Sequence, residues 1–217
     1  MGDAGRDRCM RTKVVSLKQL ELKGEAPTQN DWELFVTDEQ NNQMYSYGGV
    51  RPYDKLYKPT ADFHRLNLET MSWTNLSVRF AFVMMTVVFD IFSLPALIEV
   101  ASAISTVEGK RHMFLFGGCD EDGNPSGGLI AVDLNSFAWF NIEIPRHIPV
   151  PRLSATMVAV ENRLFIFGGR TKYEDNSPFL STFSVACYNA EDGWSWQCVD
   201  QQYPPIFRIL DTVSRQP

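Results

Sequence analysis

The chain has 217 residues, of which 44% are hydrophobic and 21% are charged, and its formal net charge is -6 at pH 7. These values are ordinary for a soluble globular protein that is long enough to bury a core, as one domain or two. The acidic balance disfavours nucleic acid as a partner, because nucleic-acid binders usually present a basic face.

Residues 1–30 form an N-terminal extension that we leave unassigned. Residues 1–11 are polar and charged and lack the apolar run of a secretory signal, so we expect a cytoplasmic location, with the nucleus as the alternative. The apolar residues from Val14 to Leu22 follow a short rhythm that suits either a helix or one strand joining a neighbour, and both alternatives stay open.

Three units of four predicted strands follow and together occupy residues 31–206. The first, at about 31–77, has strands expected at 32–37, 43–47, 61–68 and 72–74. The second, at about 95–145, has them at 101–107, 112–116, 129–134 and 138–144. The third, at about 151–200, has one strand ending near 160 and others at 163–167, 181–188 and 194–199. Turn signals separate these strands, so each unit predicts one antiparallel sheet, and 207–217 is left as a tail.

Each unit contains one aromatic-rich run that is stopped by two glycines. The three runs are QMYSYGG at 43–49, HMFLFGG at 112–118 and RLFIFGG at 163–169. Apolar residues on both faces of so short a run predict a strand that is buried on both sides. The paired glycines favour a tight turn in which φ can be positive and another backbone can approach closely.

The three units resemble kelch repeats. The residues that carry the resemblance are the double glycines and one tryptophan on each fourth strand: Gly48, Gly49, Trp73, Gly117, Gly118, Trp139, Gly168, Gly169 and Trp196. The tryptophan follows the second glycine by 24, 21 and 27 residues (49 to 73, 118 to 139 and 169 to 196). The resemblance covers about residues 31–200 and implies an all-β, kelch-type β-propeller of four-stranded antiparallel blades. We interpret the glycines and tryptophans as packing residues, which turn the chain and seal one blade against the next.

The chain departs from the family pattern in the number of blades. It holds three, whereas propellers close with about four to eight. We therefore expect an incomplete propeller, which is a fragment, a truncated product or part of an assembly that closes the ring between subunits. Self-association through the open blade edges would follow from the last alternative.

The second departure is an apolar insert at residues 78–93. The second glycines lie 69 residues apart in the first two units (49 to 118) but 51 apart in the last two (118 to 169), an excess of 18. A membrane segment is disfavoured because the apolar run from Phe80 to Phe89 is ten residues, about half of what a spanning helix needs. A buried element, a self-association patch and a retained intron remain, and we favour the intron because the repeat resumes at Leu94.

A catalytic or metal site is not expected, and we predict no cofactor. Kelch propellers include copper oxidases similar to galactose oxidase, but His64, His112 and His147 are not at ligand spacing. The four cysteines (Cys9, Cys119, Cys187 and Cys198) are scattered, and we favour free thiols over a Cys187–Cys198 pair. The acidic loop 120–124 lacks the spacing of a calcium loop and is interpreted as a solvated turn.

The sequence therefore predicts a non-catalytic interaction module or scaffold with a protein partner. Binding is expected through the loops that differ between units, at 50–60, 119–127 and 170–178, because they follow the same strand in each unit and would gather on one face. The candidate contact residues are Arg51, Tyr53, Tyr57, Asp120, Asp122, Arg170 and Tyr173. The alternatives are a fragment of a galactose-oxidase-like copper or carbohydrate-acting enzyme, and a propeller attached to a membrane by residues 78–93.

Overall fold

A computed structural model describes residues 21–28, 30–51, 58–77, 94–144, 148–173 and 177–202. Within these residues the chain is all β, as predicted, and its helical content is a single 3-10 turn, η1 (Glu39–Asn41). The described part contains no helix that is long and apolar enough to span a membrane. The apolar insert 78–93 lies outside the described residues, as do most of the predicted extension and the tail.

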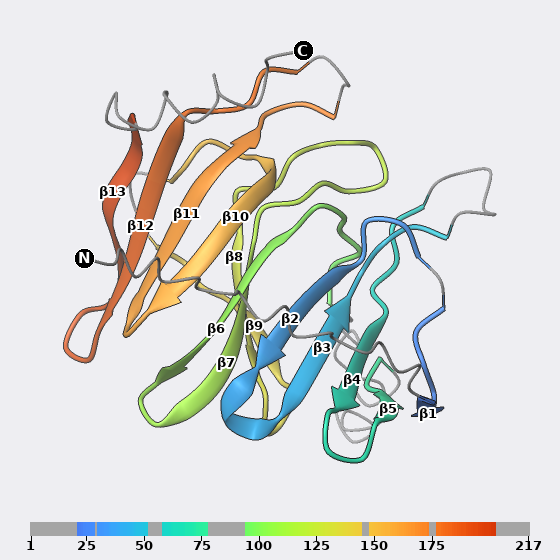
Figure 1. The fold of residues 1–217 in the computed structure, drawn as a ribbon. Helices are drawn as coiled ribbons and strands as arrows, with labels where there is room; N and C mark the ends of the chain where they lie inside the picture. Colours follow the sequence, from blue (N-terminus) through green and yellow to red (C-terminus); the bar gives the residue numbers. More distant parts are fainter. Residues whose placement is uncertain are drawn as a thin grey trace, which may run out of the picture.

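The strands form three sheets, antiparallel except for one short edge strand, which are consistent with blades of a partial kelch propeller (Figure 1). The first sheet has the order β1-β5-β4-β3-β2, with β1 Lys23–Gly24, β2 Leu34–Asp38, β3 Gln43–Tyr47, β4 Phe63–Asn67 and β5 Ser72–Asn75. The second has the order β6-β7-β8-β9, with β6 Ala101–Val107, β7 Lys110–Phe116, β8 Leu129–Asp133 and β9 Trp139–Asn141. The third has the order β10-β11-β12-β13, with β10 Leu153–Val160, β11 Arg163–Arg170, β12 Thr182–Asn189 and β13 Gly193–Gln202.

The two-residue strand β1 adds an unexpected outer edge to the first sheet. It pairs parallel to β5, with Lys23 opposite Ser72 and Gly24 opposite Trp73. Gly24 has φ +82°, and a Cβ there would lie 2.3 Å from the Trp73 carbonyl oxygen. The described end of the extension is therefore strand, while most of the apolar rhythm from Val14 lies outside the described residues.

The three sheets lie side by side with their first strands together. Strand β6 contacts both β2 and β10, and Figure 1 shows these three strands next to one another, with β5 and β13 toward the outside. All first strands run from the end of the molecule that carries the long loops toward the end that carries the short turns (Figure 1). We call these two ends the loop end and the turn end.

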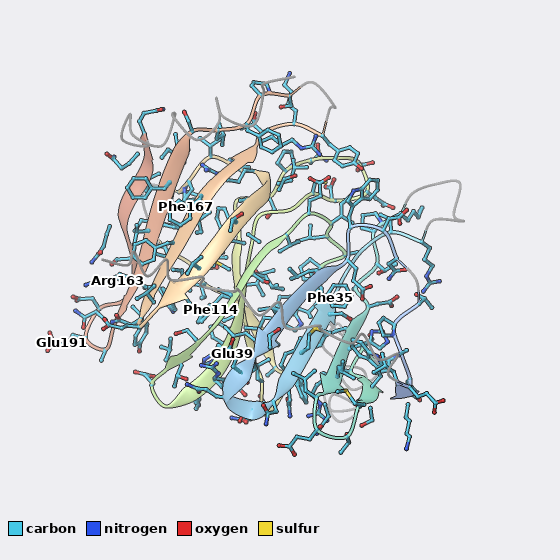
Figure 2. The ribbon with its side chains drawn as sticks, in the orientation of Figure 1. Phe35, Glu39, Phe114, Arg163, Phe167 and Glu191 are labelled. Atoms are coloured by element: carbon cyan, nitrogen blue, oxygen red, sulfur yellow. The ribbon has the colours of Figure 1, made fainter. Side chains whose placement is uncertain are left out.

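The core consists of two apolar layers, one on each face of the second sheet. Met113 and Leu115 of β7 pack in the layer shared with the first sheet, and Phe114 and Phe116 pack in the layer shared with the third. All four side chains are at most 1% exposed. Phe114 lies between the second and third sheets (Figure 2), where its ring meets Trp194 at 5.2 Å. As the apolar pattern predicts, this double-glycine strand is buried on both sides, and each such side chain contributes about 1.5–3 kcal/mol of transfer free energy.

The first glycine of two pairs, Gly48 and Gly117, lies against the segment that precedes the first strand of the next sheet. A Cβ on Gly48 would lie 2.5 Å from the Leu97 carbonyl oxygen, and one on Gly117 would lie 2.3 Å from that of Arg152. Both glycines have positive φ, +73° and +72°. No side chain fits in so small a space, so these glycines allow consecutive sheets to pack closely.

The tryptophans occupy one register position in spite of their unequal sequence gaps. Trp73 pairs with Leu66, Trp139 with Val132 and Trp196 with Ala186, each on the third strand of its sheet. The Trp196 ring meets Phe116 of the second sheet edge-on at 6.1 Å, and Trp139 packs against the core of the first and second sheets. The differences in spacing are therefore taken up by the loops.

A buried ion pair also joins the first two sheets at the turn end. Arg111 Nη2 lies 2.7 Å from Asp38 Oδ1, and the Asp38 side chain is 0% exposed. Arg111 Nε donates a second hydrogen bond of 3.0 Å to the same oxygen. Because this carboxylate is desolvated, loss of the arginine would leave a buried charge without its ion-pair partner.

Candidate functional site

The long loops of the three sheets meet at the loop end. Lys58 Nζ, after β3, lies 3.2 Å from Glu121 Oε2 in the loop after β7. The ring of Trp32, just before β2, meets that of Tyr173, just after β11, at 6.2 Å and 88°. We call this surface the loop face and define it by residues 30–33, 50–51, 58–60, 98–99, 119–127, 153–154, 170–173 and 179.

The centre of the loop face is built from one equivalent position in each sheet. Backbone bridges join Asp31 to Val50, Ile98 to Cys119 and Leu153 to Arg170, which aligns the three leading segments. The next residue is Trp32, Glu99 and Ser154 respectively, and all three have φ +55°. A positive φ is uncommon outside glycine, and such strained positions cluster at functional sites.

These three side chains line one open hollow of about 580 Å³. Its other lining residues are Glu33, Leu34, Phe35, Val100, Ala155, Arg170 and Phe179. Trp32 is 49% exposed and Phe179 is 71% exposed, so the hollow presents large apolar groups to solvent. Burial raises the pKa of Glu33 in this wall above its ordinary value, and the neighbouring Asp62 adds to the shift, although Ser46 opposes it.

A charged pair spans the hollow between the second and third sheets. Arg170 Nη2 lies 2.9 and 3.1 Å from the two carboxylate oxygens of Glu99, and Ser154 Oγ also donates to Glu99. The Arg170 guanidinium carbon lies 5.6 Å from the centre of the Tyr173 ring. This chain of contacts connects Glu99, Arg170, Tyr173 and Trp32, and so it couples all three sheets at the loop face.

Beneath this pair lies a small apolar floor that contains Cys119. It is formed by Val50, Ile98, Cys119 and Leu153, which are all buried. Burial raises the pKa of the Cys119 thiol to about 11, with Glu99 and Asp120 adding to the shift and Arg170 opposing it. Because the thiolate is the reactive form, Cys119 is an inert packing residue near neutral pH.

The predicted contact residues on the acidic loop have different surroundings. Asp120 accepts hydrogen bonds from the backbone N–H groups of Asp122 and Asn124 and from the Asn124 amide. Burial acts to raise the pKa of Asp120, but these hydrogen bonds outweigh it and hold the pKa below its ordinary value. Asp120 therefore shapes the loop, whereas Asp122 is exposed and lines a second hollow of about 450 Å³ together with Lys172 and Tyr173.

The remaining predicted residues divide into three cases. Arg51 is exposed and lies 3.6 Å from Asp62. Tyr53 and Tyr57 lie outside the described residues. Arg170 and Tyr173 come together at the loop face, as described above, although Arg170 is largely occupied by Glu99.

Sequence reasoning missed Trp32, Glu99 and Ser154. Trp32 falls at the start of a predicted strand, and a bulky aromatic residue in front of an alternating run was the only signal available. Glu99 and Ser154 carried no signal, because their equivalence appears only in the backbone conformation that they share with Trp32.

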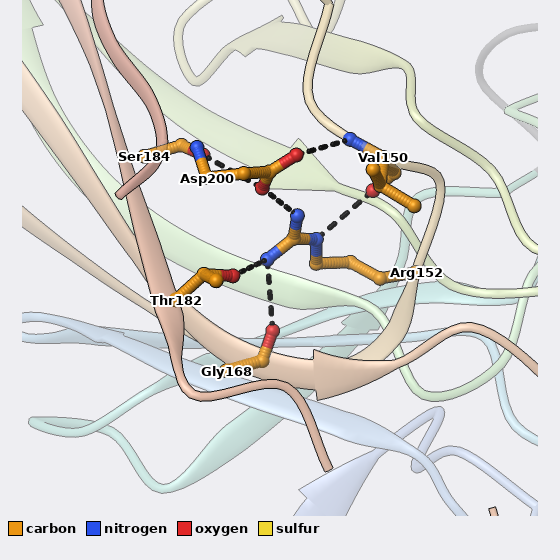
Figure 3. A network of polar contacts seen from close by, with 6 residues as sticks. All are labelled: Val150, Arg152, Gly168, Thr182, Ser184 and Asp200. Carbon is orange, nitrogen blue, oxygen red and sulfur yellow. Dashed lines mark hydrogen bonds and ion pairs between the residues drawn. The ribbon is translucent and has the colours of Figure 1, made fainter. Parts of the chain in front are cut away.

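A buried polar network positions the leading segment of the third sheet (Figure 3). Arg152 is 0% exposed and donates to the carbonyls of Val150 and Gly168, each at 3.0 Å, and to Thr182 Oγ1 at 3.3 Å. It also pairs with Asp200 of β13, whose other oxygen accepts from the Val150 N–H at 3.0 Å. The network links the segment before β10, at the inner edge of the sheet, to the outer strand β13, and so it positions Ser154.

Histidines and acidic groups do not gather into a metal centre in the part of the chain that the structure describes. His64 is on β4 of the first sheet and His112 on β7 of the second, and both side chains are buried. His147 lies outside the described residues. Cys119 and Cys187 are free thiols.

The sheets, with their first strands together and the outer tryptophans of the second and third sheets against the neighbouring sheet, define the chain as a β-propeller-type repeat protein. Residues 96–208, more than half of the chain, match the family model KLHDC2/KLHL20/DRC7 Kelch-repeats domain. The chain belongs to this family of kelch-repeat proteins, as the resemblance predicted.

A comparison with curated proteins found a partial match. Over 78 residues the chain is 28% identical to Tip elongation aberrant protein 1 of Schizosaccharomyces pombe. The match covers 34% of this chain but 7% of the yeast protein, so the chain spans a small part of that relative.

Proposed function

We propose that this chain is a non-catalytic kelch-repeat interaction module that binds a protein partner through the loop face. The observation that carries the proposal is the convergence of Trp32, Glu99 and Ser154, one from each sheet, on one open hollow. Exposed aromatic residues around a hollow, with an arginine beside them, are the groups that dominate the energetics of protein interfaces. The kelch-repeat family membership supports the same function.

The charged groups elsewhere on the loop face favour a mixed polar rim over a purely apolar interface. Arg51, Lys58 and Lys172 bring positive charge, while Glu121 and Asp122 bring negative charge. Such a rim sets the orientation and the association rate of a partner more than its affinity. The affinity is expected to come from Trp32, Tyr173 and Phe179, which are 49%, 40% and 71% exposed.

The test compares partners captured by the native chain and by loop-face variants. Cross-linked complexes of the full 217-residue chain are analysed by quantitative mass spectrometry, next to Trp32→Ala and Tyr173→Ala. Leu22→Ala is the control, because Leu22 is 50% exposed but lies next to Lys23, which pairs with Ser72 at the outer edge of the first sheet. A protein that is lost with both loop-face variants and kept with the control is then titrated against the purified chain. If no captured protein depends on Trp32 or Tyr173, the proposal is wrong.

Two alternatives from the sequence have direct tests. Stoichiometric copper in the purified protein would favour an oxidase fragment over an interaction module. Recovery of the chain in a membrane fraction that resists salt washing would favour attachment through residues 78–93. Our proposal predicts neither result, and it places the chain in the cytoplasm, with the nucleus as the alternative.

Self-association is a further part of the proposal. Val158 and Val160 on β10 are 47% and 52% exposed, on the face of the third sheet that points away from the second. An exposed apolar sheet face of this kind favours association. Light scattering on the purified chain measures its mass in solution, and a strictly monomeric species over a wide concentration range would contradict this part.

A further inference from the structure

A cleft of about 330 Å³ opens at the turn end, between the second and third sheets and away from the loop face. Strands β7, β8 and β9 form one wall, and the β12–β13 hairpin forms the other. We call it the turn-end cleft. Its volume is at the lower end of the range of small-ligand pockets, about 300–1,000 Å³.

Five aromatic rings form a continuous lining of this cleft. The ring of Phe140, which is 49% exposed at the mouth, meets His112 at 6.2 Å, and His112 meets Phe114 at 5.9 Å. Phe114 meets Trp194 at 5.2 Å, and Trp194 meets Tyr188 at 5.5 Å. Because each ring contacts the next, these contacts hold the lining in place without a ligand.

Two carboxylates stand beside these rings. Glu108 accepts a hydrogen bond from the Tyr188 hydroxyl, and this contact raises the pKa of Tyr188 above its ordinary value. Asp133 lies opposite His112 in the β7–β8 register. Burial acts to raise the pKa of Asp133, but the backbone N–H groups of Ser136 and Asn135 outweigh it and hold the pKa below its ordinary value. Lys110 is the cation in the same lining, so the carboxylates outnumber it.

The combination of rings and carboxylates decides which ligands suit the cleft. An anion would be placed beside two negative groups, and a neutral apolar ligand would desolvate them without providing a partner. A cation gains from both features, because aromatic faces attract positive charge and carboxylates pair with it. A guanidinium group is flat enough to lie on a ring while its N–H groups reach the carboxylates.

We propose that the turn-end cleft is a binding site for a guanidinium group, carried either by a small molecule or by an arginine side chain of a protein. The site is separate from the loop face, so it does not depend on the function proposed above.

The test titrates the full chain by calorimetry with N-acetylarginine amide and with N-acetylcitrulline amide, its neutral counterpart of nearly the same shape. We expect the arginine compound to bind about tenfold more tightly. Phe140→Ala, Glu108→Gln and Asp133→Asn should each weaken its binding by about the same factor. The last two variants keep an oxygen acceptor for Tyr188 and for the turn N–H groups, so they remove charge with little effect on the fold. Leu22→Ala, which truncates an exposed apolar residue next to β1 of the first sheet, should leave binding unchanged.

A short peptide with one central arginine distinguishes the two sources. Binding of both the amide and the peptide would identify a site for the free group, and binding of the peptide alone would identify a site for a protein side chain; either result supports the proposal. Equal affinity for arginine and citrulline compounds, no saturable binding of either arginine probe, or unchanged affinity in Glu108→Gln and Asp133→Asn would overturn it.

Discussion

Phe114 and Phe165 occupy the same position of the repeat, and their replacement by alanine measures what a neighbouring sheet contributes. Phe114 is 1% exposed and its ring meets Trp194 at 5.2 Å, because the third sheet covers this face of the second. Phe165 is only partly buried and stacks on Phe167 within its own strand, at 6.5 Å. We expect Phe114→Ala to cost about 3–5 kcal/mol of unfolding free energy. The smaller burial of Phe165 gives about 1–2 kcal/mol for Phe165→Ala.

Urea unfolding of the purified chain, followed by far-ultraviolet circular dichroism, gives both values. The two variants make the same chemical change in equivalent strands, so differences in intrinsic strand propensity cancel. The slope of the unfolding free energy with urea should stay the same, which shows that the denatured state is unchanged. Equal losses in the two variants would refute the reasoning, because they would mean that the third sheet's far face is covered as completely as the second sheet's.

Three further predictions follow from single contacts. Gly117→Ala should cost more than about 2 kcal/mol in thermal unfolding, because the new Cβ would meet the Arg152 carbonyl oxygen at 2.3 Å. Gly109→Ala has a similar φ of +73° but nothing within 4 Å of its Cβ, so it should cost about 1 kcal/mol. Similar losses in the two variants would show that backbone strain dominates. Asp200→Ala leaves the fully buried Arg152 without its carboxylate and should lower the unfolding free energy measured in urea by about 3 kcal/mol. Asp200→Asn should lower it by less, and equal losses in the two variants would mean that the charge is unimportant. Burial lowers the pKa of His64 below its ordinary value of 6.5, although Asp62 and Glu25 oppose the shift, so protonation disfavours the folded state. The unfolding free energy should therefore fall between about pH 7 and 5, and His64→Gln should flatten this part of the profile; an unchanged slope would contradict the assignment.

The strands that follow a clear apolar pattern could be predicted closely. The predicted strand 101–107 coincides with β6, and the predicted strand 43–47 coincides with β3. In β6 the residues Ala101, Ala103 and Val107 face the core layer that the second sheet shares with the third. Glu108 and Gly109 form the turn that ends this strand. Here local propensity and tertiary packing favour the same structure, which is the condition for a reliable prediction.

The ends of other strands depend on contacts that are distant in sequence. The predicted strand 194–199 is observed as β13, Gly193–Gln202. The polar residues Asp200 to Gln202 have no strand pattern, but Arg152 pairs with Asp200 and Thr182 pairs with Gln202. In the same way β11 continues through its two glycines because Arg170 pairs with Leu153 of β10. No local rule could predict these extensions.

The loop face could be predicted only in outline. Loops that follow equivalent strands were expected on one face, and the contact between Trp32 and Tyr173 places the first and third sheets together there. The partner of Arg170 could not be predicted, because Glu99 is 71 residues away in the chain. Arginine and tyrosine are typical interface residues and can be selected from the sequence. Whether another residue of the same chain already binds them depends on the fold.

The three residues with φ +55° explain how one fold can present different surfaces. Trp32, Glu99 and Ser154 share φ +55° at equivalent positions, so the repeat sets the direction of each side chain and the residue sets its chemistry. Glycine would avoid a strain of about 1–2 kcal/mol at each position. Glu99 and Ser154 offset that strain through their hydrogen bonds to each other and to Arg170. Trp32 is half exposed, and its edge contact with Tyr173 offsets little of the strain, which is consistent with the partner-binding role that we propose for it.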